Sequence, residues 1–235
     1  MIAEKDVSNK KVWLSVEEAL IICHGLPYEP GSVVDKSYLD VAKFFSSRGY
    51  PSVIFDFTGT GKSRGSFSLI KWLEDLEEVA ENFEKVSILG FSMGGAVALN
   101  FENAEKIVAV ASPCSAEMFS EEGLERIYAN ARLKSTLRGL KDFESFKKQF
   151  LEEFYSIEPI KSVENLRCPL MFVHGTKDDV VPFYCSEELY RKARGKKKFL
   201  IVKNGDHFLR RNERVLEKIA EWLKKVDEGV EELTL

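Results

Sequence analysis

Short runs of apolar residues recur along the chain, and each of them ends in glycine, aspartate or another turn-forming residue. Runs of this length that are rich in valine and isoleucine are typical of strands buried on both faces of a sheet. They occupy residues 20–23, 53–55, 86–89, 107–110, 170–173 and 199–202. The pattern therefore predicts about six parallel strands.

Apolar residues at helical spacing lie between several of these runs and after the last one. They are Tyr38, Leu39, Ala42 and Phe45, then Trp72, Leu76, Val79, Ala80 and Phe83, and finally Val215, Ile219 and Trp222. Because strands and helices alternate, we expect an α/β fold with a mostly parallel, twisted sheet flanked by helices. Residues 11–14 suggest an additional N-terminal antiparallel hairpin.

One interval between strands is about twice as long as the others, too long for a single crossover helix and its loops. The excess falls at residues 112–165, which carry two sets of apolar residues at helical spacing. These are Leu124, Ile127, Tyr128 and Ala131, followed by Phe143, Phe146, Phe150 and Phe154. We expect residues 1–111 and 166–235 to form the core and residues 112–165 to form a small helical lid.

The composition excludes several classes of protein. With 44% hydrophobic and 31% charged residues, the chain can bury a core and is not disordered throughout. Its net charge of −4 and lack of a basic stripe disfavour a nucleic-acid partner. The charged start resembles no signal peptide, and no apolar stretch reaches the ~18 residues of a membrane span. These features predict a soluble, cytoplasmic protein.

Four cysteines, at positions 23, 114, 168 and 185, form neither a C-x-x-C pair nor a zinc-finger spacing with histidines. No metal site is therefore expected. Free thiols in a reducing compartment are the favoured interpretation, ahead of a disulfide framework.

The most informative segment is residues 88–98, where a serine follows a predicted strand and precedes a stretch of small residues. It contains the pattern G-x-S-x-G, formed by Gly90, Ser92 and Gly94. A serine in a tight strand-to-helix turn exposes its hydroxyl, and the glycines leave room for the turn and for helix packing. The helix that follows directs N–H groups toward a developing negative charge. Ser92 is therefore the candidate nucleophile.

A serine hydroxyl needs a general base, and the chain has three histidines. His207 lies just after the last predicted strand, and in a parallel sheet that loop opens at the same edge as Ser92. His207 is therefore the preferred base, whereas a structural role is favoured for His174. The acid that orients the base is expected in the loop after the fifth run. This loop contains two adjacent acids, Asp178 and Asp179, and spacing alone does not show which of them orients the base.

An oxyanion hole needs two backbone donors directed at one point. Met93 directly follows the candidate nucleophile, so its N–H group is the first expected donor. The second is expected in the segment His24-Gly25-Leu26 that follows the first predicted strand. Gly25 permits a close approach of the backbone to the substrate, and Leu26 N–H is the expected second donor.

Together these segments resemble the α/β-hydrolase family over nearly the whole chain. The resemblance rests on residues 24–26, 56–63, 90–94, 174–182 and 205–208. The order serine, aspartate, histidine is the one that this fold uses, and the family's H-G-x-x-D-x-x-V-P pattern implies that Asp178 is the acid. The chain departs from the family at Thr58, where arginine or asparagine is usual. The short length and compact insertion are similar to small carboxylesterases of the family, including cinnamoyl and feruloyl esterases and monoglyceride-lipase-like enzymes.

This resemblance implies a serine hydrolase that cleaves carboxylic esters through an acyl-enzyme, with Ser92, Asp178 and His207 as its triad. A small-molecule ester is the expected substrate, and no cofactor is expected. The aromatic insertion is expected to roof an apolar acyl or aryl pocket, with Tyr128 and Phe143 as candidate substrate contacts. Packing of the insertion onto the core would demand the same spacing, so the two interpretations stand side by side.

Other functions remain as alternatives. An acylaminoacyl or peptide hydrolase and a thioesterase would use the same fold and the same residues. A non-catalytic binding module is more remote, because such proteins usually lack a triad residue. Residues 59–63 look like the end of a phosphate-binding P-loop, but the full pattern requires glycine where the chain has Asp56.

Overall fold

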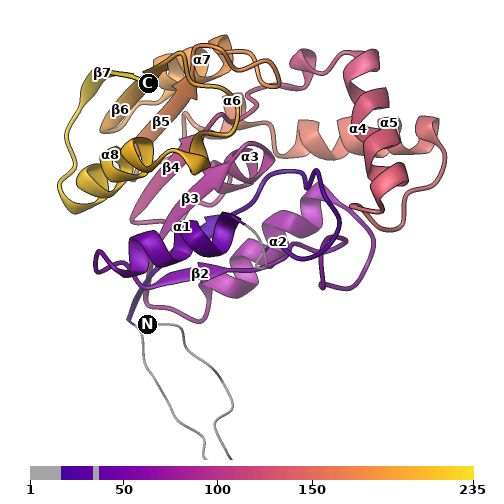
Figure 1. Ribbon diagram of the computed structural model, residues 1–235, viewed down its shortest axis with the longest axis horizontal. Helices are drawn as coiled ribbons and strands as arrows, with labels where there is room; N and C mark the ends of the chain where they lie inside the picture. Colours follow the sequence, from indigo (N-terminus) through magenta and orange to yellow (C-terminus); the bar gives the residue numbers. More distant parts are fainter. Residues whose placement is uncertain (1–16, 34–36) are drawn as a thin grey trace, which may run out of the picture.

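The centre of the molecule is a seven-stranded sheet with the order β2-β1-β3-β4-β5-β6-β7. The computed structural model describes residues 17–33 and 37–235, and all strand pairs in this part of the chain are parallel (Figure 1). The strands are β1 (Glu18–Cys23), β2 (Ser52–Ile54), β3 (Lys85–Phe91), β4 (Lys106–Val110), β5 (Leu170–Gly175), β6 (Lys197–Lys203) and β7 (Gly229–Thr234). Strands β1 to β6 coincide with the six apolar runs, so the predicted α/β fold is confirmed.

The seventh strand was not expected from the sequence. Residues of β7 alternate between an exposed face and a face that is half-buried or, at Leu233, buried, and its central residues Glu231 and Glu232 are charged. An edge strand pairs through its backbone on one side only, so it needs no apolar run. Lys198 of β6 pairs with Glu231 at 2.6 Å, which ties the edge strand to the sheet. The hairpin expected at residues 11–14 lies outside the described residues.

Helices cover both faces of the sheet (Figure 1). One face packs against α1 and α8, and the other packs against α2, α3 and α7. The core helices are α1 (Ser37–Ser46), α2 (Leu69–Ala80), α3 (Met93–Ala98), α7 (Tyr184–Lys192) and α8 (Glu213–Lys224), with the short 3-10 helix η2 (Leu209–Arg211). In the part of the chain that the structure describes, no helix is both long and apolar enough to cross a membrane.

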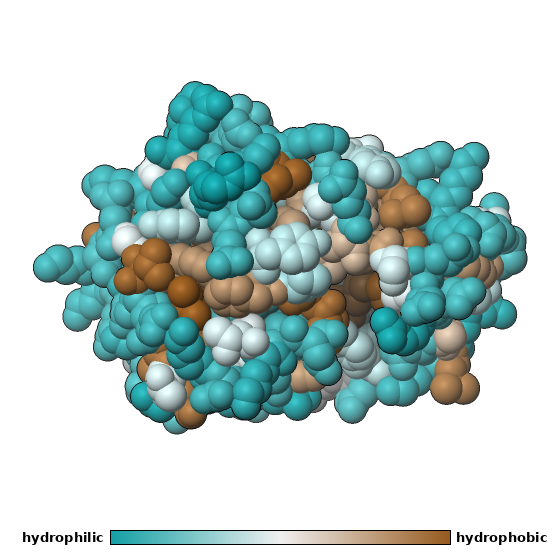
Figure 2. All heavy atoms as spheres, turned by 90° about the horizontal axis from the view of Figure 1, so that it is seen from above, coloured by the Kyte–Doolittle hydropathy of each residue, from teal (hydrophilic) through white to brown (hydrophobic). Residues whose placement is uncertain are grey.

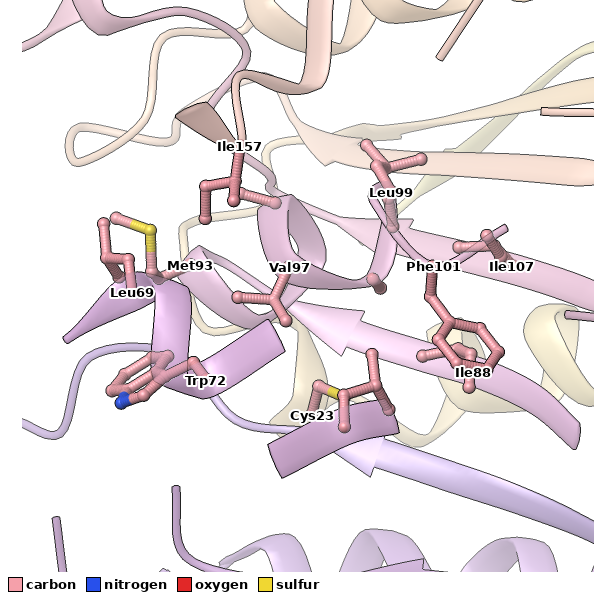
Figure 3. Close-up of a cluster of buried hydrophobic side chains, with 14 of the residues drawn as sticks. Cys23, Leu69, Trp72, Ile88, Met93, Val97, Leu99, Phe101, Ile107 and Ile157 are labelled. Carbon is pink, nitrogen blue, oxygen red and sulfur yellow. The ribbon is translucent and has the colours of Figure 1, made fainter. Parts of the chain in front are cut away.

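The core beneath α3 is closely packed. Met93 and Val97 of α3, Trp72 of α2 and Cys23 of β1 are all almost fully buried, and Figure 3 shows their side chains meeting between the helices and the sheet. Burial of large apolar side chains of this kind contributes roughly 1.5 to 3 kcal/mol each. The turn before α3 is therefore anchored to the rigid centre of the molecule.

Residues 112–165 form a helical region beyond the end of the sheet, which we call the cap (Figure 1). It contains η1 (Ala116–Met118), α4 (Glu121–Lys134), α5 (Phe143–Ser156) and α6 (Pro159–Ser162). Phe146, Phe150 and Phe154 lie on the buried face of α5, as the helical spacing predicts. The Phe150 ring lies 5.0 Å from Phe119 of the cap and 6.4 Å from Phe67 of the core, so aromatic contacts join the two regions.

The expectation that all cysteines are free thiols is wrong for one pair. Cys114, at the start of the cap, forms a disulfide with Cys185 of α7, and their Cα atoms lie 5.0 Å apart. Cys23 and Cys168 are free. The partners are 71 positions apart in the sequence, so only the folding of the cap over α7 brings them together.

Candidate active site

Ser92 occupies the sharp turn between β3 and α3. Its backbone has φ 53° and ψ −124°, an unfavourable region for a residue with a side chain. The Ser92 N–H group donates a hydrogen bond to the Val110 carbonyl at 2.8 Å, which holds the turn against β4. A Cβ atom at Gly94 would lie 2.4 Å from the Cys23 carbonyl oxygen, so this position requires glycine. Helix packing thus fixes the direction of the serine hydroxyl.

His207 lies beside Ser92 and is nearly buried. Its Nε2 atom is 3.0 Å from Ser92 Oγ, and its Nδ1 atom is 2.8 Å from Asp178 Oδ2. A carboxylate can only accept, so Nδ1 carries the proton and Nε2 is free to accept from the Ser92 hydroxyl. The three side chains that the sequence singled out therefore form one continuous chain of hydrogen bonds.

The Asp178 carboxylate has both of its oxygens occupied. Oδ1 accepts from the backbone N–H groups of Val180 and Val181, each at 2.9 Å. Oδ2 accepts from His207 and lies 3.3 Å from Nε2 of His174. Burial tends to raise the pKa of Asp178, but the hydrogen bonds from His174, His207 and Val181 outweigh it and hold this pKa well below its usual range. Asp178 is therefore ionised and fixed in position.

His174 is fully buried behind Asp178 and is held by two further partners. Its Nε2–H group points to the Val181 carbonyl at 3.0 Å, and its Nδ1 atom accepts from Ser186 Oγ at 2.7 Å. His174 therefore positions the carboxylate and does not reach Ser92, in line with the structural role favoured for it. Asp179, the other acid left open by spacing, is exposed and borders the cavity beneath the cap.

The segment after β1 approaches the serine closely. A Cβ atom at Gly25 would lie 2.8 Å from the Cβ of Ser92, so only glycine fits between the two turns. Met93 is the first residue of α3, where the amide has no partner within the helix. The Leu26 amide donates in none of the hydrogen bonds found among the described residues. Both amides are thus available beside Ser92.

His24 holds this segment in place from within the core. Its Nδ1–H group donates to the Gly25 carbonyl at 2.6 Å, and its Nε2 atom accepts from the Phe57 amide at 3.1 Å. Burial lowers the pKa of His24 to about 4, against the smaller effects of Gly25 and Asp56. The neutral ring therefore links the loop after β1 to the loop after β2.

The loop after β2 is built around a carboxylate and not around a phosphate. Asp56 accepts from the amides of Val33 at 2.8 Å and Lys62 at 2.9 Å, so it occupies the centre of the turn that looked like a P-loop. Thr58, the departure from the family pattern, donates through its amide and hydroxyl to Asp75 of α2 at 2.6 and 2.9 Å. These bonds anchor the loop to α2.

A cavity of about 350 Å³ lies between Ser92 and the cap, and we call it the cap cavity. Its apolar walls come from Met93 of α3 and from cap residues that include Met118, Phe119 and Ile127. Figure 2 shows a hollow with hydrophobic residues on the side of the molecule where α4 and α5 lie. The cavity explains how an apolar group could reach the serine.

Tyr128 and Phe143 are not among the residues that line the cap cavity. Their rings lie 5.7 Å apart, and the Tyr128 hydroxyl donates to the Lys141 carbonyl at 2.7 Å. Sequence reasoning chose these two aromatic residues and missed Met118, Phe119 and Ile127. Periodicity identifies which residues face inward, but it does not distinguish a packing contact from a cavity wall.

A second cavity, of about 340 Å³, also reaches Ser92 and lies beside His207. We call it the arginine cavity, because Arg210 and Arg211 of η2 line it together with Gly25, Tyr38 and Phe208. Sequence reasoning did not single out these arginines. Among the described residues, no three acidic, histidine or cysteine side chains converge as metal ligands would.

Comparison with known proteins agrees with this geometry. The model of a protein family described as "Alpha/beta hydrolase family" matches residues 20–221, which is most of the chain. The chain belongs to the alpha/beta hydrolase family. The match runs from β1 to the last turn of α8, so it includes the segments that carry Ser92, Asp178 and His207.

Curated relatives within the alpha/beta hydrolases are distant. An uncharacterized protein of Bacillus subtilis, YqkD, is 27% identical over 201 residues, which cover 80% of this chain and 64% of YqkD. Human mitochondrial palmitoyl-protein thioesterase ABHD10 is 25% identical over 191 residues, covering 73% of this chain and 62% of ABHD10. The chain thus spans less than two thirds of the length of these relatives.

Solved structures of other alpha/beta hydrolases share the fold. A monoacylglycerol lipase from Paleococcus ferrophilus superimposes with a TM-score of 0.67 and 20% identity, covering 87% of this chain and 93% of the lipase. Est1E from Butyrivibrio proteoclasticus, solved with ferulic acid bound, gives a TM-score of 0.65 and 20% identity, covering 88% of this chain and 90% of Est1E. At this identity the likeness concerns the fold alone.

Proposed function

We propose that this alpha/beta hydrolase is a serine hydrolase that cleaves carboxylic esters through an acyl-enzyme. The observation that carries the proposal is the hydrogen-bonded chain from Ser92 through His207 to Asp178, at the junction of two cavities. A relay of this kind is what a serine hydroxyl needs to become a nucleophile at neutral pH. The monoacylglycerol lipase that shares this fold acts on carboxylic esters by its name, which agrees with the proposed reaction class.

In the proposed reaction, Ser92 Oγ attacks the ester carbonyl while His207 Nε2 takes its proton. Asp178 holds the ring in the required tautomer and stabilises the imidazolium. The amides of Leu26 and Met93 donate hydrogen bonds to the carbonyl oxygen as it becomes negative. The bond between carbonyl carbon and leaving oxygen then breaks, and His207 gives its proton to the alcohol. Water repeats the cycle on the acyl-serine and releases the acid.

Thioesters are the second candidate substrates. The observation in their favour is the match to human ABHD10, whose name describes a palmitoyl-protein thioesterase. Both substrates would pass through the same acyl-serine. A thiol is a better leaving group than an alcohol, so its release needs less help from His207. Parallel assays of an ester and a thioester with the same acyl group would rank the two.

The experiment that tests the proposal is labelling with a fluorophosphonate, followed by an ester panel from acetyl to long acyl that includes aryl esters. We expect the wild-type protein to take up one label at Ser92, and the Ser92→Ala variant to take up none and to lose turnover by at least about 10⁴-fold. Ser47→Ala is a matched control, because Ser47 is exposed after α1 and remote from both cavities. Ester hydrolysis that survives in Ser92→Ala would refute the proposal.

A further inference from the structure

Ser92 lies where the cap cavity and the arginine cavity meet. The two cavities share Ser92 and residues 26–28, so the segment after the Gly25 turn separates them. An ester has two arms, the acyl chain and the alcohol, that diverge from the carbonyl carbon which the serine attacks. A substrate bound at Ser92 can therefore extend one arm into each cavity.

The position of His207 decides which arm enters which cavity. His207 lines the arginine cavity and is absent from the lining of the cap cavity. In the proposed reaction, His207 Nε2 gives its proton to the leaving atom, so the leaving group has to lie on the side of this ring. The acyl chain then takes the cap cavity, whose walls at Met118, Phe119 and Ile127 suit hydrocarbon.

The cavity on the side of His207 carries an excess of positive charge. Arg210 is half-buried and Arg211 is exposed, and neither forms an ion pair with a carboxylate among the described residues. Among the described residues that line this cavity, Glu29 is the acidic one. Two guanidinium groups against one carboxylate leave a net positive wall, and a charge close to a low-dielectric protein wall attracts an anion more strongly than it would in water.

The side chain of Arg210 is held in a defined orientation. Its Nε–H group donates to Ser37 Oγ at 3.0 Å, and its guanidinium carbon lies 5.1 Å from the Tyr38 ring and 5.2 Å from the Phe208 ring. The Arg211 guanidinium carbon lies 4.7 Å from the same Phe208 ring. Ring contacts orient both groups, and within residues 17–33 and 37–235 their terminal N–H donors have no hydrogen-bond partner, which favours binding of an oxyanion.

We propose that the arginine cavity binds a leaving group that carries an anion, either a carboxylate or a phosphate, on an alcohol or a thiol. Arg210 and Arg211 are the residues that select for this charge. This inference rests on the proposed function, and it names the class of substrate for the same reaction. The products are the free acid and the anionic alcohol or thiol, with one water consumed.

The test compares kcat/KM for pairs of esters with eight-carbon acyl chains, in which one member carries an anionic group and the other is neutral. Octanoyl glycolate is paired with octanoyl glycolamide, and 1-octanoylglycerol 3-phosphate is paired with 1-octanoylglycerol, so a carboxylate and a phosphate are tested separately. A third pair, suberate monomethyl ester and methyl octanoate, places the charge on the acyl arm. The readout is the ratio of kcat/KM for the anionic over the neutral member, because the ratio cancels any general loss of activity.

In the double variant Arg210→Gln, Arg211→Gln, we expect the ratio for at least one of the first two pairs to fall about tenfold, as expected for partly exposed charge pairs. The single variant Arg211→Gln should give a smaller fall, and it carries little risk to folding because this side chain is exposed. The double lysine variant should keep most of the ratio. Arg167→Gln is the matched control for the single variant. Arg167 is exposed and precedes β5, at the amino-terminal ends of the strands and away from Ser92, and its substitution also removes one positive charge.

Three results would overturn the inference. An unchanged ratio for both leaving-group pairs in the double variant would show that the arginines do not select for charge. A fall confined to the suberate pair would show that the acyl arm, and not the leaving group, occupies the arginine cavity. A wild-type protein that hydrolyses none of the esters would refute the proposed function itself, which separates that failure from the other two.

Discussion

The rim that carries Ser92, Asp178 and His207 and the cap at residues 112–165 differ in the contacts that hold them in place. Hydrogen bonds hold the rim: Asp178 alone receives two backbone amides and the ring of His207. In the cap, ring contacts place Phe150 within 6.4 Å of Phe67 and 5.6 Å of Phe146, and they act beside the Cys114–Cys185 disulfide and the hydrogen bond from Arg138 to the Gly61 carbonyl at 2.8 Å. The same short chain thus contains one region whose geometry depends on directed bonds and one in which a cluster of buried rings adds apolar packing.

This difference predicts how each region responds to mutation. A hydrogen bond depends on the type and direction of two atoms, so changing one atom of the rim can remove function without unfolding the protein. Apolar packing is the sum of many weak contacts, so loss of a ring from the cap lowers stability in proportion to the volume removed. Two variants test this distinction, with the larger effect expected at the rim, and a third tests a buried histidine in the core beside the rim.

The Asp178→Asn variant should cause the largest loss of activity. The amide of asparagine no longer favours the His207 tautomer with its proton on Nδ1, so we expect kcat for an ester to fall about 10⁴-fold. Asp179→Asn is the matched control and should lose less than about tenfold, because this exposed side chain is outside the relay. Thermal melting should show that both variants remain folded. Equal losses in the two variants would contradict the assignment of the acid to Asp178.

Phe150→Ala should lower the stability of the protein and leave most of its activity. Phe150 is fully buried among the rings of Phe67, Phe119, Phe146 and Phe154, so removal of its ring should lower the free energy of unfolding by about 3 to 5 kcal/mol. Urea denaturation measures this change. Below the transition, kcat for a short-chain ester should fall by less than about tenfold, because no atom of the relay changes.

A control for Phe150→Ala comes from the same region. Leu133 of α4 is 84% exposed, so Leu133→Ala should change the free energy of unfolding by less than about 0.5 kcal/mol. A fall in kcat for Phe150→Ala as large as the one in Asp178→Asn would show that cap packing and relay geometry are not separable.

The smallest of these effects concerns pH. The folded state holds His24 neutral, with a pKa of about 4 against an ordinary value of 6.5, because the ring is buried. Below pH 6.5, His24 binds a proton in the unfolded chain but stays neutral in the folded chain. The contribution of His24 to stability is therefore complete above pH 6.5 and decreases as the pH falls toward 4. Each pKa unit corresponds to about 1.4 kcal/mol, so we expect a loss of about 3 kcal/mol over this window.

Urea denaturation between pH 7 and pH 4 measures this loss. The His24→Gln variant should be less stable at pH 7 but should lack this part of the pH dependence. Asp178 does not obscure the result: its folded pKa is lowered, so its contribution is lost only when the pH falls below the ordinary value of 3.8. An identical pH dependence in wild type and His24→Gln would contradict the assignment.

Much of the fold could be predicted because a buried parallel strand needs an unbroken apolar run, and six such runs are present. β7 was not predicted, because an edge strand needs no apolar run and the glutamates of β7 are typical of a solvated surface. The cap was visible as an interval too long for one helix. The pairing of Cys114 with Cys185 was not, because it depends on how the cap lies on α7.

The candidate site divides in the same way. The sequence by itself determined which residues follow the strand ends, and parallel strands bring those ends to one edge. This reasoning named Ser92 and His207 before any coordinates and left Asp178 and Asp179 open, and the family pattern then implied Asp178. Only the tertiary structure decided that His174 supports Asp178, that Met118 and Ile127 and not Tyr128 line the cap cavity, and that Arg210 and Arg211 lie beside His207. The physical reason is that strand ends are set by local pattern, whereas cavity walls are set by side chains that meet from distant segments.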